Sequence, residues 1–131
     1  MKHIFGGFAN SSFKRIDNKW CPYKGGGKSF LFLLSGANPS FHILQKGKES
    51  NELQASPSYL FMFGNGDLYI SDNCNDNYNS ESKFGSSYEL PNGISIYSEA
   101  ANSYLAGKST FKVEEIEVFK IVLNISQWKL S

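Results

Sequence analysis

The sequence lacks two features that would point to a membrane or to nucleic acid. None of its apolar stretches approaches the roughly 20 residues that a helix needs to cross a bilayer. There is also no excess of charge, because 13 Lys and Arg stand against 12 Asp and Glu, and the lysines are scattered. A basic patch is the electrostatic signature of nucleic-acid or anionic-membrane binding. We therefore expect no nucleic-acid partner and no membrane insertion.

Cysteine is scarce as well, and no secretory signal is recognisable. Gly6 and Gly7 interrupt the N-terminus before a long apolar core forms. Cys21 and Cys74 are the two cysteines, and neither has a second cysteine or a histidine at metal-ligand spacing. A reducing compartment would keep both as thiols. These features predict a cytoplasmic protein without a metal site at its cysteines.

A complete phosphate-binding loop is missing, although residues 24–35, KGGGKSFLFLLS, resemble the end of one. The motif places a glycine ahead of its Gly-Lys-Ser with four residues between them, and Pro22 occupies that position. A true loop also opens a helix, whereas the aromatic run that follows here is typical of a strand. We expect no nucleotide and no other cofactor, and we expect the glycines to form a turn into a strand.

Aromatic residues and turn signals are what the sequence has in quantity. Eleven Phe, seven Tyr and two Trp suit strands better than helices. The pattern predicts strands over residues 3–9, 29–35, 40–45, 59–63, 68–70, 88–90 and 94–96. Residues 64–67 carry the strongest hairpin signal, residues 72–87 a long polar loop, and residues 98–104 one or two helical turns. Several short strands at turn-marked spacing predict a mainly β protein, an antiparallel β-sandwich with short peripheral helices.

The last predicted strand spans Phe111–Val122. Its apolar residues fall at odd positions 111 and 113 and then at even positions 116 and 118. Because side chains alternate along a strand, a common apolar face requires a one-residue bulge at Glu114–Glu115. Phe119 and Ile121 would then lie on the other face. This pattern predicts a strand that is covered on both sides.

Acidic and amide side chains cluster between Asp67 and Asn79. Asp67, Asp72 and Asp76, with asparagines at positions 73, 75, 77 and 79, offer oxygen ligands for calcium. The spacing of an EF-hand loop is absent, however. Asp and Asn are also ordinary turn residues, because they tolerate left-handed backbone. We therefore predict no metal site.

Catalytic chemistry has few candidates. Glu114, Glu115 and Glu117 offer paired carboxylates, but acidic residues between apolar ones more often form a solvated or partner-facing stripe. A dyad of Cys74 and His42 stays open, because residues that are distant in sequence can be neighbours in space. No complete set of nucleophile, base and oxyanion donors can be named. We predict no catalytic residue.

Three stretches together resemble the TLDc domain: IFGGFANSSFK at 4–14, FGNGDLYISDNCN at 63–75 and SYLAGKSTFKVEEIEVFKI at 103–121. GKSFLFLLS at 27–35 and GSSYELP at 85–91 fall in the order that this family shows. The resemblance covers nearly the whole chain. It implies a β-sandwich with peripheral helices, a role in protection against oxidative stress and, as in several members, association with the vacuolar proton pump. The family has no settled active site.

Two segments of the family pattern can be located in this sequence, and loops on a rigid scaffold are the usual place for contacts with a partner. The family's Gly-Asp-Leu-Tyr segment falls on residues 66–69, and its acidic strand falls on residues 114–118. We expect a non-enzymatic protein-interaction module whose contact surfaces are that strand and the loop at 64–79. The predicted partner-binding residues are Gly66, Asp67, Glu114, Glu115 and Glu117. The alternative is a hydrolase or redox enzyme that uses Cys74 or the three glutamates.

Family domains usually begin some tens of residues before the FGGF segment. We therefore expect a single TLDc-like domain over residues 1–131 that is shortened at its N-terminus. A sandwich without its upstream strand has an open sheet edge, and unpaired backbone groups on an edge favour pairing with another chain. Self-association through such an edge is accordingly expected.

Overall fold

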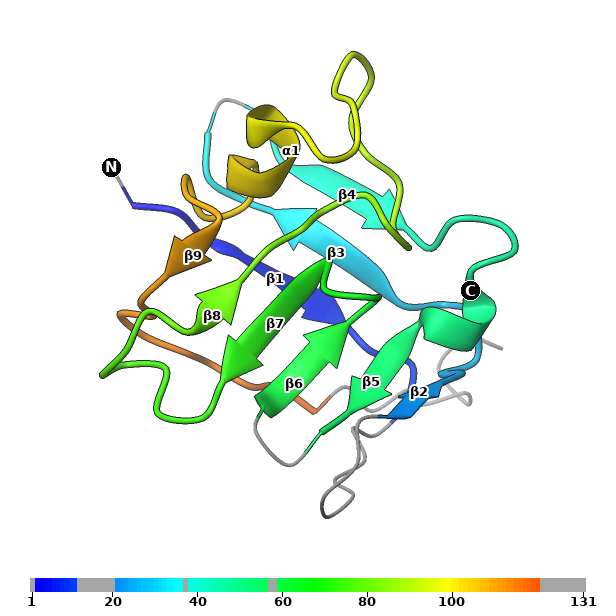
Figure 1. Ribbon diagram of the computed structural model, residues 1–131, viewed down its shortest axis with the longest axis horizontal. Coiled ribbons are helices and arrows are strands. Elements are labelled where there is room, and N and C mark those ends of the chain that lie inside the picture. The colour runs from blue at the N-terminus through cyan, green and yellow to red at the C-terminus, as the bar shows by residue number, and fades with distance from the viewer. Residues whose placement is uncertain (1, 12–20, 37, 57–58, 121–131) are drawn as a thin grey trace, which may run out of the picture.

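The computed structural model describes residues 2–11, 21–36, 38–56 and 59–120 (Figure 1). Within these ranges the chain forms nine strands, one 3-10 helix and one α-helix. A three-stranded antiparallel sheet has the order β1-β3-β4, and a six-stranded one has the order β2-β5-β6-β7-β8-β9. The smaller sheet consists of β1 (Phe5–Phe8), β3 (Phe30–Leu33) and β4 (Ser40–Ile43). The larger consists of β2 (Cys21–Tyr23), β5 (Leu53–Ala55), β6 (Tyr59–Phe63), β7 (Leu68–Ser71), β8 (Ser80–Glu81) and β9 (Thr110–Phe111).

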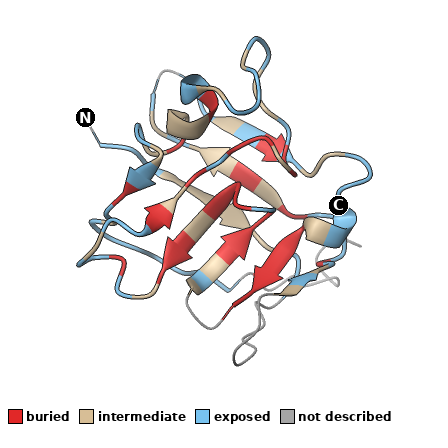
Figure 2. Ribbon diagram, in the orientation of Figure 1, coloured by how far each residue is buried: buried red, intermediate tan, exposed pale blue. Residues whose placement is uncertain are grey.

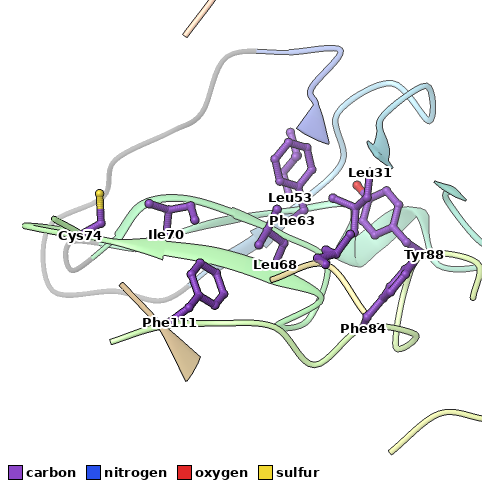
Figure 3. Packing of buried hydrophobic residues seen from close by; sticks show 10 residues of the cluster. Leu31, Leu53, Phe63, Leu68, Ile70, Cys74, Phe84, Tyr88 and Phe111 are labelled. Atoms are coloured by element: carbon purple, nitrogen blue, oxygen red, sulfur yellow. The ribbon is translucent and has the colours of Figure 1, made fainter. Parts of the chain in front are cut away.

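The two sheets pack face to face around one hydrophobic core (Figures 1 and 3). Gly7 of β1 permits a close approach, because a Cβ atom there would lie 2.5 Å from the ring of Phe63 on β6. The core combines residues from both sheets and from the loops between them: Leu31, Leu53, Phe63, Leu68, Ile70, Cys74, Phe84, Tyr88, Leu105 and Phe111. The predicted mainly β fold with two antiparallel sheets is confirmed.

Two short helices lie outside the sheets. The α-helix α1 (Glu99–Ser103) begins after Ser98, whose Oγ accepts a hydrogen bond from the Ala101 amide at 3.1 Å, the usual role of an N-cap serine. The predicted helical turns at 98–104 are thus confirmed. The 3-10 helix η1 (Glu49–Asn51) precedes β5. In the part of the chain that the structure describes, no helix is long and apolar enough to cross a membrane.

Local signals predicted the clearest strands. The strands at 3–9, 29–35, 40–45, 59–63 and 68–70 are present with bounds close to these, and residues 64–67 form the expected turn between β6 and β7. The strands at 88–90 and 94–96 were wrong predictions. Tyr88 makes only an isolated bridge with Leu44, and residues 94–96 contain no strand. Strands β2, β5 and β8 were not predicted, and β8 interrupts the predicted polar loop.

The predicted acidic strand over Phe111–Val122 was also wrong. Strand β9 ends at Phe111, and residues 112–120 continue as an irregular, mostly exposed segment (Figure 2). Val118 and Phe119 are 82% and 77% exposed, so this stretch is not covered on both sides. The change of parity that we explained by a bulge lies beyond the end of the strand, where Val113 still packs against the core but Ile116 and Val118 are exposed. Positions 121 and 122 lie outside the described residues.

Candidate functional site

The acidic segment, residues 112–120, presents three of the predicted site residues to solvent. Glu114, Glu115 and Glu117 are all exposed. The segment continues directly from β9, which is the outermost strand of the larger sheet. It also exposes apolar side chains, since Ile116 is 37% exposed beside the far more exposed Val118 and Phe119. Carboxylates and apolar groups are therefore interspersed along one accessible stretch of chain.

Hydrogen bonds attach the start of this segment to residues 72–79, the part of the predicted loop that precedes β8, which we call the polar loop. The Val113 amide donates to the Cys74 carbonyl at 2.9 Å. The Asn75 side-chain amide donates to the carbonyls of Val113 and Glu114, each at 3.2 Å. The structure thus brings together two regions that the sequence analysis proposed separately as contact surfaces. Cys74, through its carbonyl, and Asn75, through its side chain, join them.

A shallow, open recess lies at this junction. It is lined by Asn75, Tyr78, Lys112, Val113 and Glu114. Tyr78 is 63% exposed, so its ring is available to a partner. An aromatic ring beside an amide, a cation and a carboxylate suits the mixed chemistry of a protein interface better than a small-molecule pocket, which is deeper and more apolar.

Gly66 and Asp67, the other two predicted site residues, are buried and lie apart from this surface. The Asp67 side chain is fully buried. Its carboxylate accepts hydrogen bonds from one hydroxyl and three backbone amides, which belong to Ser86 and to Gly85, Ser87 and Tyr88 at 3.0–3.1 Å. We call this arrangement the Asp67 cradle. Burial raises the pKa of Asp67 above its ordinary value, and these hydrogen bonds offset only part of the increase.

A second buried carboxylate occupies the glycine-rich loop, and the sequence analysis missed it. Glu52 is fully buried. It accepts hydrogen bonds from the amides of Gly25 at 2.9 Å, Gly27 at 2.8 Å and Ser29 at 3.2 Å, and from the Ser29 hydroxyl. Gly26 and Gly27 have positive φ, a conformation that glycine adopts readily and that here accompanies the convergence of alternate amides on one anion. We call this arrangement the Glu52 cradle.

The Glu52 cradle explains the likeness to a phosphate-binding loop. Its amides converge on an anion, but that anion is a side chain of the same protein. Burial raises the pKa of Glu52, yet the hydrogen bonds from Ser29, Gly25 and Gly27 lower it by more, so the net pKa is below the usual value. The available signal was the run of glycines at 25–27, which indicated an anion site without indicating its occupant.

Tyr88 connects the two cradles across the core. Its amide belongs to the Asp67 cradle, and its fully buried phenol donates to the Glu52 carbonyl at 2.8 Å. The same carbonyl accepts the Gly64 amide at 2.9 Å. Two loops that are far apart in sequence are therefore fixed to one polar network. Figure 3 shows the Tyr88 side chain within the hydrophobic core, where its ring centroid lies 6.2 Å from that of Phe63.

His42 and Cys74 belong to different surroundings. His42 Nδ1 lies 3.0 Å from the Glu89 carbonyl, so it carries the proton and donates; Nε2 lies 2.9 Å from Ser40 Oγ. Burial lowers the pKa of His42, which keeps the ring neutral at neutral pH. The Ser40 hydroxyl also contacts Tyr104 Oη at 2.9 Å. Cys74 is 2% exposed and its thiol lies near Asn75 Oδ1, so no hydrogen bond among the described residues joins a cysteine–histidine dyad.

The carboxylates and amides considered for calcium mostly have roles within the fold. Asp67 is in its cradle, and Asn77 bridges Ser71, Asn79 and the Asp72 carbonyl. The described ranges contain no group of three or more His, Cys, Asp or Glu residues that could hold a metal ion.

Comparison with known proteins identifies the family. No curated protein and no solved structure matches the chain. The family model described as the TLDc domain matches residues 1–122. That match includes both cradles, the polar loop and the acidic segment. Because it covers nearly the whole of the 131 residues, this chain belongs to the TLDc domain family.

Proposed function

We propose that this TLDc domain is a non-enzymatic protein-interaction module that binds its partner through the acidic segment and the adjoining polar loop. The observation that carries the proposal is the composition of this surface. Three exposed glutamates are interspersed with exposed Ile116, Val118 and Phe119 on a segment that hydrogen bonds attach to the domain at Cys74 and Asn75. Apolar anchors among charged neighbours are typical of protein interfaces.

The chemistry of this surface indicates which side chains a partner would present to it. Three carboxylates within four residues favour basic side chains opposite them, and charge complementarity chiefly governs association rate and choice of partner. Ile116 and Phe119 would fill apolar depressions between those basic groups. Gly66 and Asp67 contribute indirectly in this proposal, because they shape the interior under the hairpin rather than touch the partner.

The biological setting of the proposal comes from the family. We extend it to a cytoplasmic domain that contributes to protection against oxidative stress and associates with subunits of the vacuolar proton pump. Membership of the TLDc family supports this extension. The acidic segment supplies a surface on which such an association would be tested.

The test is equilibrium binding of the purified chain to purified vacuolar proton pump. We expect saturable binding that weakens at least about 10-fold in the double variant Glu115→Lys/Glu117→Lys, in line with the cost of juxtaposed like charges. Glu89→Lys, which reverses an exposed glutamate outside the segment, is the matched control and should bind as the wild type does. Equal affinity of all three proteins would exclude the acidic segment. No binding by the wild type would remove the pump from the proposal.

The enzymatic alternative gains no comparable support. Cys74 is almost fully buried, and the three glutamates lie on an open surface rather than in a cleft that excludes water. Ser40 and His42 form a hydroxyl–imidazole pair, but the imidazole is buried, and Ser40 does not line the recess beside the acidic segment.

A further inference from the structure

The outer side of the smaller sheet has an unusual composition, which the strand register defines. Gly6 pairs with Phe32, and Phe32 with Phe41; one row away, Phe8 pairs with Phe30, and Phe30 with Ile43. The ladder continues by one step at its end, where the Leu34 amide donates to the Ile4 carbonyl at 2.8 Å. Because alternate residues of a strand share a face, these positions lie on one side of the sheet. We call them the apolar face: Ile4, Gly6, Phe8, Phe30, Phe32, Leu34, Phe41 and Ile43.

The opposite side of the same sheet is the side that packs against the core. Gly7 faces the ring of Phe63, Leu31 is fully buried, and His42 is 6% exposed. The apolar face therefore points away from the larger sheet. An antiparallel sheet that turns one face to water normally carries polar residues on that face. All eight positions here are apolar or glycine, and this departure requires a physical reason.

The apolar face is exposed as well as apolar. Ile4 is 52% exposed, Leu34 45%, Phe41 62% and Ile43 58%. Taking about 200 Å² for a free large apolar side chain, these four residues alone expose roughly 400 Å² of apolar surface. A contiguous patch of that size is in the range that marks an interaction site on a soluble domain.

The aromatic side chains of the face hold one another in place. Phe8 stacks on Phe30 with ring centroids 5.2 Å apart, and Phe41 meets Phe30 edge-on at 5.9 Å. Phe32 lies over Gly6, where a Cβ atom would be 2.8 Å from its ring. A surface that is already ordered loses little conformational entropy when it is covered, so it is suited to binding.

We infer that the apolar face is a homodimer interface and that its occupant is the same face of a second copy of this chain. A two-fold symmetric contact places identical surfaces against each other, so its residues must be compatible with themselves. In a symmetric contact a charged face would be brought against the same charges, but the eight positions of the apolar face include no charged side chain. Pairing would bury roughly 800 Å² from the four exposed residues, and the partly buried phenylalanines bring the total near the 1,000 Å² expected of a specific interface. An interface of this size predicts a weak, concentration-dependent dimer.

This contact differs from pairing through an open sheet edge. Face-to-face packing uses side chains from β1, β3 and β4 together, whereas edge pairing would use the backbone of one outer strand. A substitution beside β1 and one on β4 should therefore both weaken a face dimer. An edge dimer through β4 would be insensitive to the substitution beside β1.

Sedimentation equilibrium over a wide range of protein concentrations tests the inference. We expect the wild type to show a monomer–dimer equilibrium, and Ile4→Glu and Phe41→Glu each to raise the dimer Kd at least about 10-fold, because a buried unpaired charge is costly. Leu60→Glu is the control, since Leu60 on β6 is 45% exposed, as Leu34 is, but lies on the other sheet. It should dimerise as the wild type does. Circular dichroism and thermal unfolding will show whether each variant is folded, and Ile4→Ser and Phe41→Ser serve as milder replacements.

Three results would overturn the inference. The first is a wild type that stays monomeric at every concentration. The second is a dimer that persists in both face variants. The third is a dimer that is lost in Phe41→Glu but kept in Ile4→Glu, which would assign the contact to the edge of β4.

Discussion

Carboxylates have different roles in the interior of the domain and on its acidic segment. Glu52 and Asp67 lie in the interior. The acidic segment carries Glu114, Glu115 and Glu117. Each interior carboxylate is fully buried and surrounded by amide and hydroxyl donors from a loop distant in sequence. The glutamates of the acidic segment are exposed. A buried charge must be satisfied within the fold, so it fixes structure. An exposed charge stays hydrated at little cost and remains free to meet a partner.

The two interior cradles also differ from each other. Both carboxylates lose hydration, which raises their pKa values, and both gain hydrogen bonds, which lower them. At Glu52 the hydrogen bonds outweigh burial, and at Asp67 burial outweighs the hydrogen bonds. Glu52 should therefore contribute more to stability as an anion than Asp67 does. Substitutions at Glu52 and Asp67 should therefore differ in their cost to stability, and both should cost more than substitutions in the acidic segment.

The largest effect is expected from Glu52→Ala. The substitution leaves the amides of Gly25, Gly27 and Ser29 without their acceptor, and each buried unpaired donor costs about 1–3 kcal/mol. Partial hydration of the loop will recover some of this cost, so we expect a loss of about 3 kcal/mol in the free energy of unfolding. Asp67→Ala should lose about 2 kcal/mol, because removing its costly buried charge offsets part of the damage. Urea unfolding monitored by fluorescence measures both.

Glu115→Ala is the control for these two variants, because it removes a carboxylate that is exposed. Its effect should stay within about 0.5 kcal/mol, as for most surface substitutions. A larger loss for Asp67→Ala than for Glu52→Ala would contradict the order of the two cradles. Losses below about 1 kcal/mol for both would show that neither cradle stabilises the fold.

The link between the cradles is expected to be worth less than either of them. Tyr88→Phe removes the phenol that donates to the Glu52 carbonyl and leaves the ring in the core. That carbonyl keeps its second donor, the Gly64 amide. We therefore expect a loss of about 1 kcal/mol, the usual net contribution of one hydrogen bond. Tyr97→Phe, on an 84% exposed ring, is the matched control and should leave the unfolding midpoint unchanged.

The dependence of stability on pH should have opposite signs at the two cradles. The pKa of Glu52 is lowered in the folded state, so its contribution is present above its unfolded pKa and is lost as pH falls through the folded one. The pKa of Asp67 is raised, so its contribution is full below its unfolded pKa and is lost as pH rises through the folded one. The stability difference between wild type and Glu52→Gln should therefore grow with pH in the acid range. The difference between wild type and Asp67→Asn should shrink.

Urea unfolding of the three proteins at several acid pH values gives these differences, and subtraction cancels the groups that all three share. Slopes of the same sign would contradict the assignment of the two pKa directions.

Local chemistry decided which parts of the fold were predictable. The hairpin at 64–67 was found because its turn residues are adjacent in sequence, and the aromatic strands because their runs are continuous. Strand β2 was missed because Pro22 indicates a turn, yet β2 is an edge strand, where proline is tolerated. The Glu52 cradle was missed because its donors lie 23–27 residues away. Such contacts follow from the pairing of β2 with β5, which no local pattern specifies.

For the acidic segment, the surface residues were predicted but the local structure was not. Its alternation of apolar and acidic residues is a strand pattern, and it predicted the right residues for a surface but the wrong local structure. Alternation indicates a strand only where one face has a core to cover. Beyond Phe111 the apolar side chains of Ile116 and Val118 find no such face among the described residues. The candidate site was therefore predictable as a set of residues, whereas its attachment through Asn75 was not.

The smallest effect on stability, and the one that bears most on function, is expected from Glu115→Lys/Glu117→Lys. Both side chains are exposed, so reversing their charge removes no buried contact, and the free energy of unfolding should change by less than about 0.5 kcal/mol. The same double variant should bind a protein partner at least about 10-fold more weakly, because charge reversal places like charges across the interface. Glu52→Ala should have the opposite pair of effects. It should lower the free energy of unfolding but leave partner affinity unchanged under conditions in which the variant is folded. Urea unfolding and equilibrium binding on the same preparations separate the two outcomes. A double variant that loses stability as much as affinity would show that the acidic segment belongs to the folded core rather than to the surface that meets a partner.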